Sequence, residues 1–353
     1  MNPSDIDLMR TLTDIDINMN KFGTSILFFM GNLGNLCSIL IFSTRSWRKN
    51  VCVFYFTFNL WCNLAYINSS MLGNFFIIAL NVNAHNSNNV ICKLFYYIKL
   101  LCSSIYPTVL ILASIDRLLI SSQNVDTRLY SSKRLAYLTV TISLFFWVLS
   151  LVHILIKVNI QEVYPGIKIC YYDLSGNYYD FLFYSVLLVS AIMPLIMVIL
   201  STLAFKNVRM IRIVPRQRQR ELRSMNKKDF QLLRCLFAQN IIYILFSIPI
   251  VFSVVYSRIL RYRTLTQLDV AIVTFLNNIG TFFHSIPYCS SIVIFLVISR
   301  AFRQELKRWY HKILLKDWIL PNEEENRIAG TQTNENCELR NVGINYIVIS
   351  KSN

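Results

Sequence analysis

Residues 178–205 read YYDFLFYSVLLVSAIMPLIMVILSTLAF, a stretch in which Asp180 is the single charged residue. A helix of about 20 mainly apolar residues is long enough to cross roughly 30 Å of hydrocarbon. Six further stretches of this kind bring the number to seven, and together they cover residues 22–44, 52–81, 92–121, 134–156, 178–205, 230–257 and 268–298. The sequence therefore predicts an all-α membrane protein whose core is a seven-transmembrane helix bundle over residues 22–299.

The overall composition agrees with a membrane location. Hydrophobic residues make up 54% of the chain and charged residues 15%, whereas a soluble domain usually carries about 25% charged residues. The net charge of +16 would raise the question of nucleic acid in a soluble protein. Here the basic residues lie mostly in short segments between apolar runs, so we expect a topology signal and no nucleic-acid partner.

The distribution of lysine and arginine predicts the orientation. Basic residues gather between the first and second runs, between the third and fourth, between the fifth and sixth, and after the seventh. Such loops usually face the cytoplasm. We expect residues 1–21 to be extracellular, the C-terminus to be cytoplasmic, and the protein to be a multi-pass protein of the plasma membrane. The first apolar run is too long for a signal-peptide core, and we expect it to act as its own insertion signal.

The segment after the last run has its own pattern. Residues 300–316 are basic and carry apolar residues at helical spacing: Phe302, Leu306, Trp309, Ile313 and Leu314. Such a helix is expected to lie on the lipids of the inner leaflet. Residues 317–353 are polar, and we expect a disordered cytoplasmic tail.

Several short motifs follow the runs at fitting intervals. Cys92 and Arg117 lie 25 positions apart, and Asp116 precedes the arginine. The other motif residues are Gly34, Asn35, Trp147, Cys170, Pro194, Pro249, Phe302 and Arg303. In this order, over about residues 22–315, the chain resembles the rhodopsin-like (class A) G-protein-coupled receptors, as a divergent member similar to neuropeptide receptors.

The resemblance implies roles for these residues. Cys92 and Cys170 would form a disulfide that ties the second outer loop over a ligand pocket. Asp116 and Arg117 would form a switch for G-protein coupling, and Asp229 would face this arginine; alternatively, Asp229 is a solvated residue at a helix start.

Other positions have structural roles in the same family. Pro194, Pro249 and Pro287 would be helix hinges, or alternatively static kinks. Asn35, Asn63 and Trp147 would be polar residues of the core.

The chain also departs from the family pattern. A bulky phenol and a neutral amide stand where the family builds a sodium site from a small polar residue and a carboxylate, so we expect no bound sodium or other metal. The usual switch residues are replaced as well. The departures are Asn63, Tyr106, Leu118, Thr202, Ser247 and Phe295.

Lys99 lies eighteen positions before Arg117, where receptors for amines carry an aspartate. A lysine there would repel an ammonium ligand, although it could instead snorkel outward or pair within the bundle. No lysine lies between residues 270 and 298, which argues against retinal as a cofactor.

The loop around Cys170 is rich in tyrosine, including Tyr171 and Tyr172, and suits a peptide ligand, although it could equally be an aromatic belt at the membrane interface. We expect a neuropeptide-type ligand whose pocket includes Lys99, Ser247 and His284 as well as these tyrosines.

Competing classes lack their own signals. A transporter would need inverted repeats or paired broken helices, and an intramembrane enzyme would need a catalytic constellation, whereas His153 and His284 stand in different runs without a partner motif. We therefore expect no enzyme activity, no catalytic residue and no cofactor. The partners expected are an extracellular ligand, a heterotrimeric G protein and membrane lipids. The alternative is a receptor-like seven-helix protein that takes a non-peptide ligand or does not signal through a G protein.

Overall fold

The computed structural model describes residues 3–80, 87–120, 131–164, 167–172, 177–213, 227–260 and 266–314. The chain divides into two compact units, Met1–Gln304 and Glu305–Asn353. The predicted tail at residues 317–353 lies outside the described residues.

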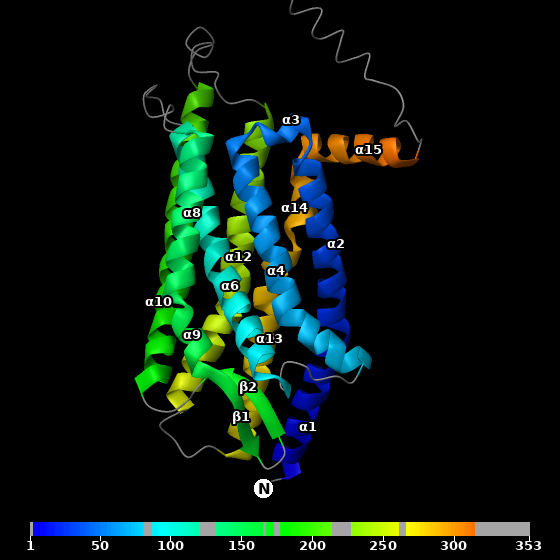
Figure 1. Ribbon diagram of the computed structural model, residues 1–353, viewed down its shortest axis with the longest axis vertical. Coiled ribbons are helices and arrows are strands. Elements are labelled where there is room, and N and C mark those ends of the chain that lie inside the picture. The colour runs from blue at the N-terminus through cyan, green and yellow to red at the C-terminus, as the bar shows by residue number, and fades with distance from the viewer. Residues whose placement is uncertain are drawn as a thin grey trace, which may run out of the picture. The chain divides into compact units, whose positions relative to one another are not determined.

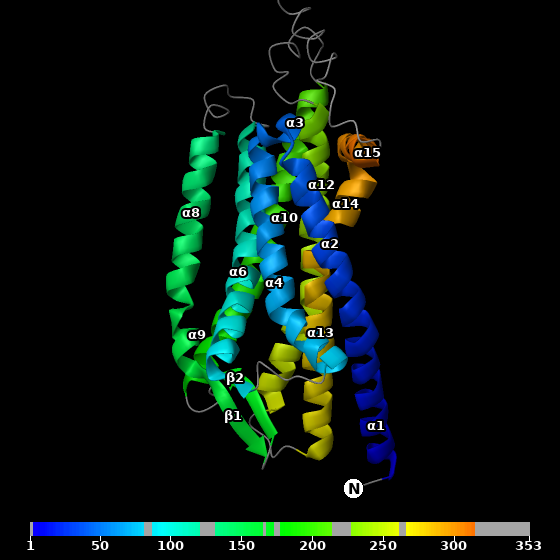
Figure 2. The ribbon, with the colours of Figure 1, turned by 45° about the vertical axis from the view of Figure 1, so that its right-hand side comes forward.

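The first unit is a bundle of long helices that lie side by side, as Figures 1 and 2 show from two directions. A two-stranded sheet lies at the same end of the bundle as the N-terminus (Figure 1). The elements are α1 (Pro3–Asn18), the π-helix η1 (Met19–Thr24), α2 (Ser25–Phe42), α3 (Arg45–Arg48), α4 (Val51–Leu80), α6 (Asn89–Ile120), α8 (Lys133–Ser150), α9 (Val152–Lys157), β1 (Val158–Tyr164), β2 (Ile167–Tyr172), α10 (Asn177–Ile213), α12 (Lys227–Leu260), α13 (Gln267–Cys289), α14 (Ser291–Ile298) and α15 (Arg300–Leu314).

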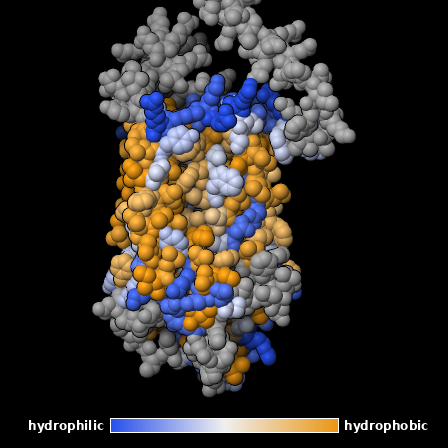
Figure 3. All heavy atoms as spheres, in the orientation of Figure 1, coloured by the Kyte–Doolittle hydropathy of each residue, from blue (hydrophilic) through white to orange (hydrophobic). Residues whose placement is uncertain are grey.

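Length and composition identify the helices that can cross a membrane. Among the described residues five segments qualify, and α13 with α14, bent by 45° at their junction, would be a sixth as one span. The five are Pro3–Phe42, Asn89–Ile120, Lys133–Lys157, Asp180–Ala204 and Lys228–Leu260. On the face drawn in Figure 3, hydrophobic residues form a broad band along the helices, and hydrophilic residues gather at the end where α3 lies. The chain is thus mainly helical and has the character of a multi-pass membrane protein.

Helix α4 has 30 residues but is not among these spans. Two of its asparagines, Asn59 and Asn63, are buried inside the bundle. α4 therefore packs with these polar side chains inward.

The N-terminal segment, which the sequence predicted only as an extracellular stretch ahead of the first span, is helical. Residues Pro3–Asn18 form α1, which continues through η1 into α2. α1 packs against α13 (Figure 2), where the Asn278 side-chain amide donates to the Asp16 carboxylate at 2.7 Å. This contact between distant segments gives the polar helix a partner.

Capping residues set the start of two helices. The Asn88 carboxamide oxygen accepts from the backbone amides of Val90 and Ile91 at 2.9 and 3.3 Å, so α6 begins there and Cys92 falls in its first turn. Thr266 and Asp269 form a reciprocal capping box at the start of α13.

The three predicted core polar residues make contacts between helices. Asn35 donates to the carbonyl of Tyr288 at 3.0 Å, and Asn63 donates to the hydroxyl of Ser291 at 3.2 Å. The Trp147 indole donates to Thr108 at 3.0 Å. Both asparagines are fully buried, whereas Trp147 is half-buried at the surface of α8.

The predicted hinge prolines all lie inside helices, and α6 contains a fourth, Pro107. The described break in the last span comes at Ser290, three residues after Pro287, where the Ser290 hydroxyl donates to the Pro287 carbonyl at 3.0 Å. Whether Pro194 and Pro249 act as hinges stays a prediction.

Candidate functional site

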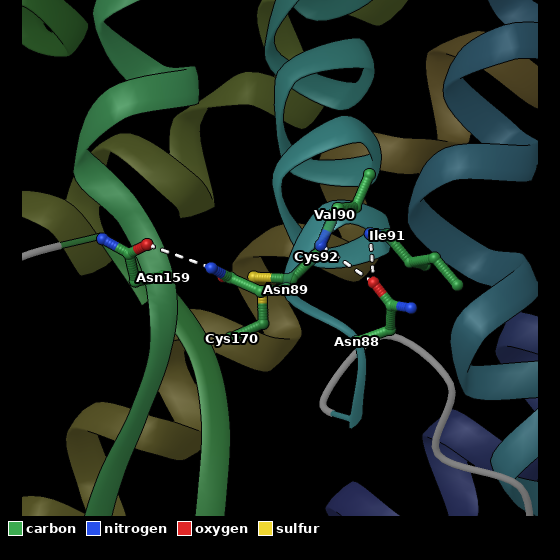
Figure 4. Close-up of a disulfide and its surroundings, with 7 residues drawn as sticks. All are labelled: Asn88, Asn89, Val90, Ile91, Cys92, Asn159 and Cys170. Carbon is green, nitrogen blue, oxygen red and sulfur yellow. Dashed lines mark hydrogen bonds between the residues drawn. A yellow bond between two sulfur atoms is a disulfide. The ribbon is translucent and has the colours of Figure 1, made fainter.

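One end of the bundle, called here the disulfide end, is closed by a hairpin bonded to α6. β1 and β2 pair antiparallel with Ile160 opposite Cys170, and Cys170 is disulfide-bonded to Cys92. Figure 4 shows the bridge beside a hydrogen bond of 3.4 Å from Asn89 to Asn159 of β1. The predicted disulfide is confirmed, and it ties the hairpin to the first turn of α6.

A cavity of about 230 Å³ lies beside this bridge. Its wall combines hydroxyl, amide and aromatic side chains from five elements, η1, α4, α6, β2 and α13. The lining residues are Asn20, Thr24, Ser69, Ser70, Met71, Cys92, Phe95, Tyr96, Lys99, Cys170, Asn278, Thr281, Phe282 and Ser285.

Lys99 is the one charged residue in this lining, and it takes no part in an ion pair within the described residues. Its place on the cavity wall agrees with its predicted pocket position. The side chains of Tyr171 and Tyr172 lie outside the described part of the chain.

The other two predicted pocket residues do not line the cavity. Ser247 is buried in α12 and donates to the carbonyl of Tyr243, one turn earlier, at 2.6 Å. His284 lies one residue before Ser285 on α13 and contacts the hydroxyl of Tyr288 at 3.3 Å. Among the described residues, α12 therefore contributes none to the cavity wall. α13 contributes Ser285, which follows His284 in the sequence, but not His284 itself.

His284 belongs instead to a buried tyrosine cluster. The rings of Tyr66 and Tyr288 stack with centroids 3.9 Å apart, and Tyr106 lies 4.7 Å from Tyr288. The Tyr66 hydroxyl lies 3.4 Å from that of Ser285, which lines the cavity. The cluster therefore connects the cavity to the centre of the bundle, where Tyr106 is fully buried.

The N-terminal helix contributes to the same cavity, which the sequence did not indicate. The Asp16 carboxylate accepts from Asn278 at 2.7 Å and from Asn20 at 3.1 Å, and both amides line the cavity. Asp16 thus positions part of the wall without being one of the lining residues.

A second polar cluster, called here the Arg117 cluster, lies near the other end of α6. Arg117 is 1% exposed, and its guanidinium contacts Asp116 through Nη2 at 2.6 Å and Nε at 3.1 Å. Its Nη1 contacts Asp229 of α12 at 3.2 Å. The predicted contact is present, and the alternative of a solvated Asp229 does not hold, because this residue is buried.

Two further residues complete the Arg117 cluster, and sequence reasoning missed both. The Asn50 amide, just before α4, donates to Asp229, while the Ser131 hydroxyl, just before α8, donates to Asp116. Neither residue belongs to a motif or a periodic run, so the sequence carried no local signal for them. Each carboxylate therefore holds Arg117 and a loop residue at the same time.

The short helix α3 also holds the start of α12. The Lys228 ammonium donates to Ser46 at 2.7 Å and lies 5.3 Å above the Trp47 ring. Next to Trp47, the Phe42 ring contacts Phe295 and Phe302 with centroids 4.9 and 5.5 Å apart. Phe295 is thus a fully buried packing residue.

Comparison of the chain with models of known protein families and with curated proteins finds no match. Two features of the described structure bear on function. One is a disulfide-tied polar cavity at one end of α6, and the other is a buried arginine held by two carboxylates near its other end.

Proposed function

We propose that this protein is a rhodopsin-like G-protein-coupled receptor that passes the signal of an extracellular ligand, a peptide in class, to a heterotrimeric G protein. The observation that carries the proposal is the buried contact between Arg117 of α6 and Asp229 of α12. The disulfide-tied cavity lies near the opposite end of α6, and Cys92 and Arg117 are separated by roughly 37 Å at 1.5 Å per residue.

The proposal includes seven spans and an orientation. α4 would be the seventh span, beside the five apolar segments and the bent pair, since its 30 residues reach roughly 45 Å. The disulfide end would face the outside, where cysteines can oxidise, and the basic segments would face the cytoplasm of a cell whose plasma membrane holds the protein. The basic α15 would then lie at the inner leaflet.

The Arg117 cluster offers a two-state element for such signalling. In the conformation described here, Arg117 is covered and bonded to both carboxylates. Movement of the start of α12 away from α6 would break the contact with Asp229 and free the guanidinium for a partner. Hydrogen bonds to charged groups contribute roughly 1.5–3 kcal/mol each, so the ligand has to favour the open state by a similar amount.

A signalling assay tests the proposal. Cells expressing the chain are exposed to a library of peptides, each as the free acid and as the amide, and cAMP and calcium are recorded for the wild type, Arg117→Ala and a matched control, Arg134→Ala, whose side chain is exposed at the start of α8. We expect at least one peptide to give a response that Arg134→Ala keeps and Arg117→Ala loses at equal surface expression. If no peptide gives a response despite normal surface delivery, the proposal fails in favour of a receptor-like protein with a non-peptide ligand or without G-protein signalling.

A further inference from the structure

We infer that the cavity at the disulfide end binds an anionic group, a carboxylate in chemical class, which pairs with Lys99 and anchors the ligand. The inference deepens the proposed function and rests on it for the role of the ligand. The binding itself can be measured without any G protein.

Lys99 has no counter-charge in the part of the chain that the structure describes. Among those residues, no aspartate or glutamate lines the cavity and none forms an ion pair with Lys99. The acid joined to the wall, Asp16, already accepts hydrogen bonds from Asn20 and Asn278. Asp180, on the neighbouring α10, is 2.8 Å from Arg258.

A charged side chain within a membrane-spanning helix is costly and usually pairs with another group or faces a cavity. Because the described residues offer Lys99 no carboxylate, a ligand that brings one gains a charge-assisted contact and relieves this cost. A cationic ligand would meet repulsion at the same place.

The other residues that line the cavity also suit a carboxylate ligand. Hydroxyls of Thr24 and Thr281 line the cavity and make no side-chain hydrogen bond within the described residues, so they can donate to a second carboxylate oxygen. The rings of Phe95 and Phe282 supply apolar surface for the carbon atoms of the ligand that adjoin its carboxylate. Cation, hydroxyl donors and aromatic rings are thus together in one cavity.

The volume limits how much of the ligand enters. About 230 Å³ is below the roughly 300–1,000 Å³ of pockets that hold a whole drug-sized molecule. With roughly 30 Å³ for each water-sized group, the cavity has room for seven or eight such groups. This fits a carboxylate with a short carbon chain or one residue of a peptide.

Two sources of carboxylate fit this space, a small organic acid and the acidic end of a peptide. The experiment uses the full chain, purified in lipid nanodiscs, and follows its melting temperature against probe concentration. The first pair of probes is hexanoate and the uncharged hexanamide. The second pair is N-acetyl-glycyl-phenylalanine as the free acid and as the amide.

We expect an acid to raise the melting temperature and its amide to have no effect. Stabilisation by hexanoate alone assigns a small acid, and stabilisation by the dipeptide acid assigns a peptide carboxylate. Lys99→Gln should raise the half-saturating concentration of the acid roughly tenfold or more. Lys99→Arg should restore binding, and Lys93→Gln, six residues earlier on α6 and outside the lining, should leave it unchanged.

Three outcomes overturn the inference: equal stabilisation by acid and amide, equal weakening by Lys93→Gln and Lys99→Gln, or no stabilisation of the folded wild type by either acid. Because melting needs no G protein, each of these leaves the signalling test intact. Conversely, carboxylate binding without any cellular response would refute the proposed signalling and leave this site standing.

Discussion

Replacement of Asp229 by alanine tests the Arg117 cluster directly. The change removes the contact of 3.2 Å with Arg117 and the hydrogen bond from Asn50. Hydrogen bonds to charged groups contribute roughly 1.5–3 kcal/mol each, but Arg117 keeps Asp116 and does not become an uncompensated buried charge. We therefore expect the free energy of unfolding to fall by roughly 2–4 kcal/mol, near or below the 3–5 kcal/mol found when a buried pair loses one partner.

The loss of stability in Asp229→Ala can be compared with that in two other aspartate variants. Asp116→Ala removes both contacts to the arginine, at 2.6 and 3.1 Å, together with the Ser131 bond, so it should cost more than Asp229→Ala. Asp180 pairs with Arg258 at 2.8 Å but its side chain is 36% exposed, and such a pair contributes less than about 1 kcal/mol.

Thermal unfolding of the three purified variants in nanodiscs gives the order. We expect the largest fall in melting temperature for Asp116→Ala, an intermediate fall for Asp229→Ala and the smallest for Asp180→Ala. In cells, a loss of about 1.4 kcal/mol from the closed state multiplies the open population roughly tenfold, so Asp229→Ala should also raise ligand-independent signalling. The reasoning is refuted if Asp229→Ala melts no lower than Asp180→Ala.

Two further variants extend the test. Asn50→Ala removes the Asn50 hydrogen bond to Asp229 and leaves the contact with Arg117, so its melting temperature should lie between those of the wild type and Asp229→Ala; a fall as large as that of Asp229→Ala would contradict the assigned contact. Gly280→Ala places a Cβ 3.0 Å from the Ile250 Cα, where backbone has to move, and should cost roughly 1–3 kcal/mol by chemical denaturation. Gly23→Ala is its control, because the atoms nearest to the new Cβ belong to the side chains of Phe282 and Met19 and not to backbone, and a cost equal to that of Gly280→Ala would argue against close packing of α12 on α13.

The helices were predictable because hydropathy and length are local properties. Residues 52–81 and 134–156 were expected as runs, and the structure has α4 at Val51–Leu80 and α8 with α9 over Lys133–Lys157. The last run, expected at 268–298, is instead broken at Ser290. Ser290 and Ser291 interrupt the apolar run there, and the predicted hinge or kink at Pro287 lies three residues before the break, so the sequence carried a sign of it.

The Arg117 cluster was predictable in part. The resemblance implied that Asp229 faces Arg117, and their contact is present. Asn50 was not predictable, because it reaches Asp229 across 179 positions from outside any apolar run. A loop asparagine in a sequence has no mark that distinguishes a buried donor from a solvated one.

The sequence by itself determined that the chain is mainly helical and membrane-like and which residues form most helices. The pairing of Cys92 with Cys170 was an expectation from the resemblance, and the structure contains it. Tertiary structure alone decided that the polar N-terminal segment is a helix on α13, and that Asp16 holds two amides of the cavity wall. It also decided that Lys99 faces this cavity while Ser247 does not. The reason is that periodicity reports which face of a helix is apolar, whereas the neighbour of a polar side chain depends on how separate helices pack.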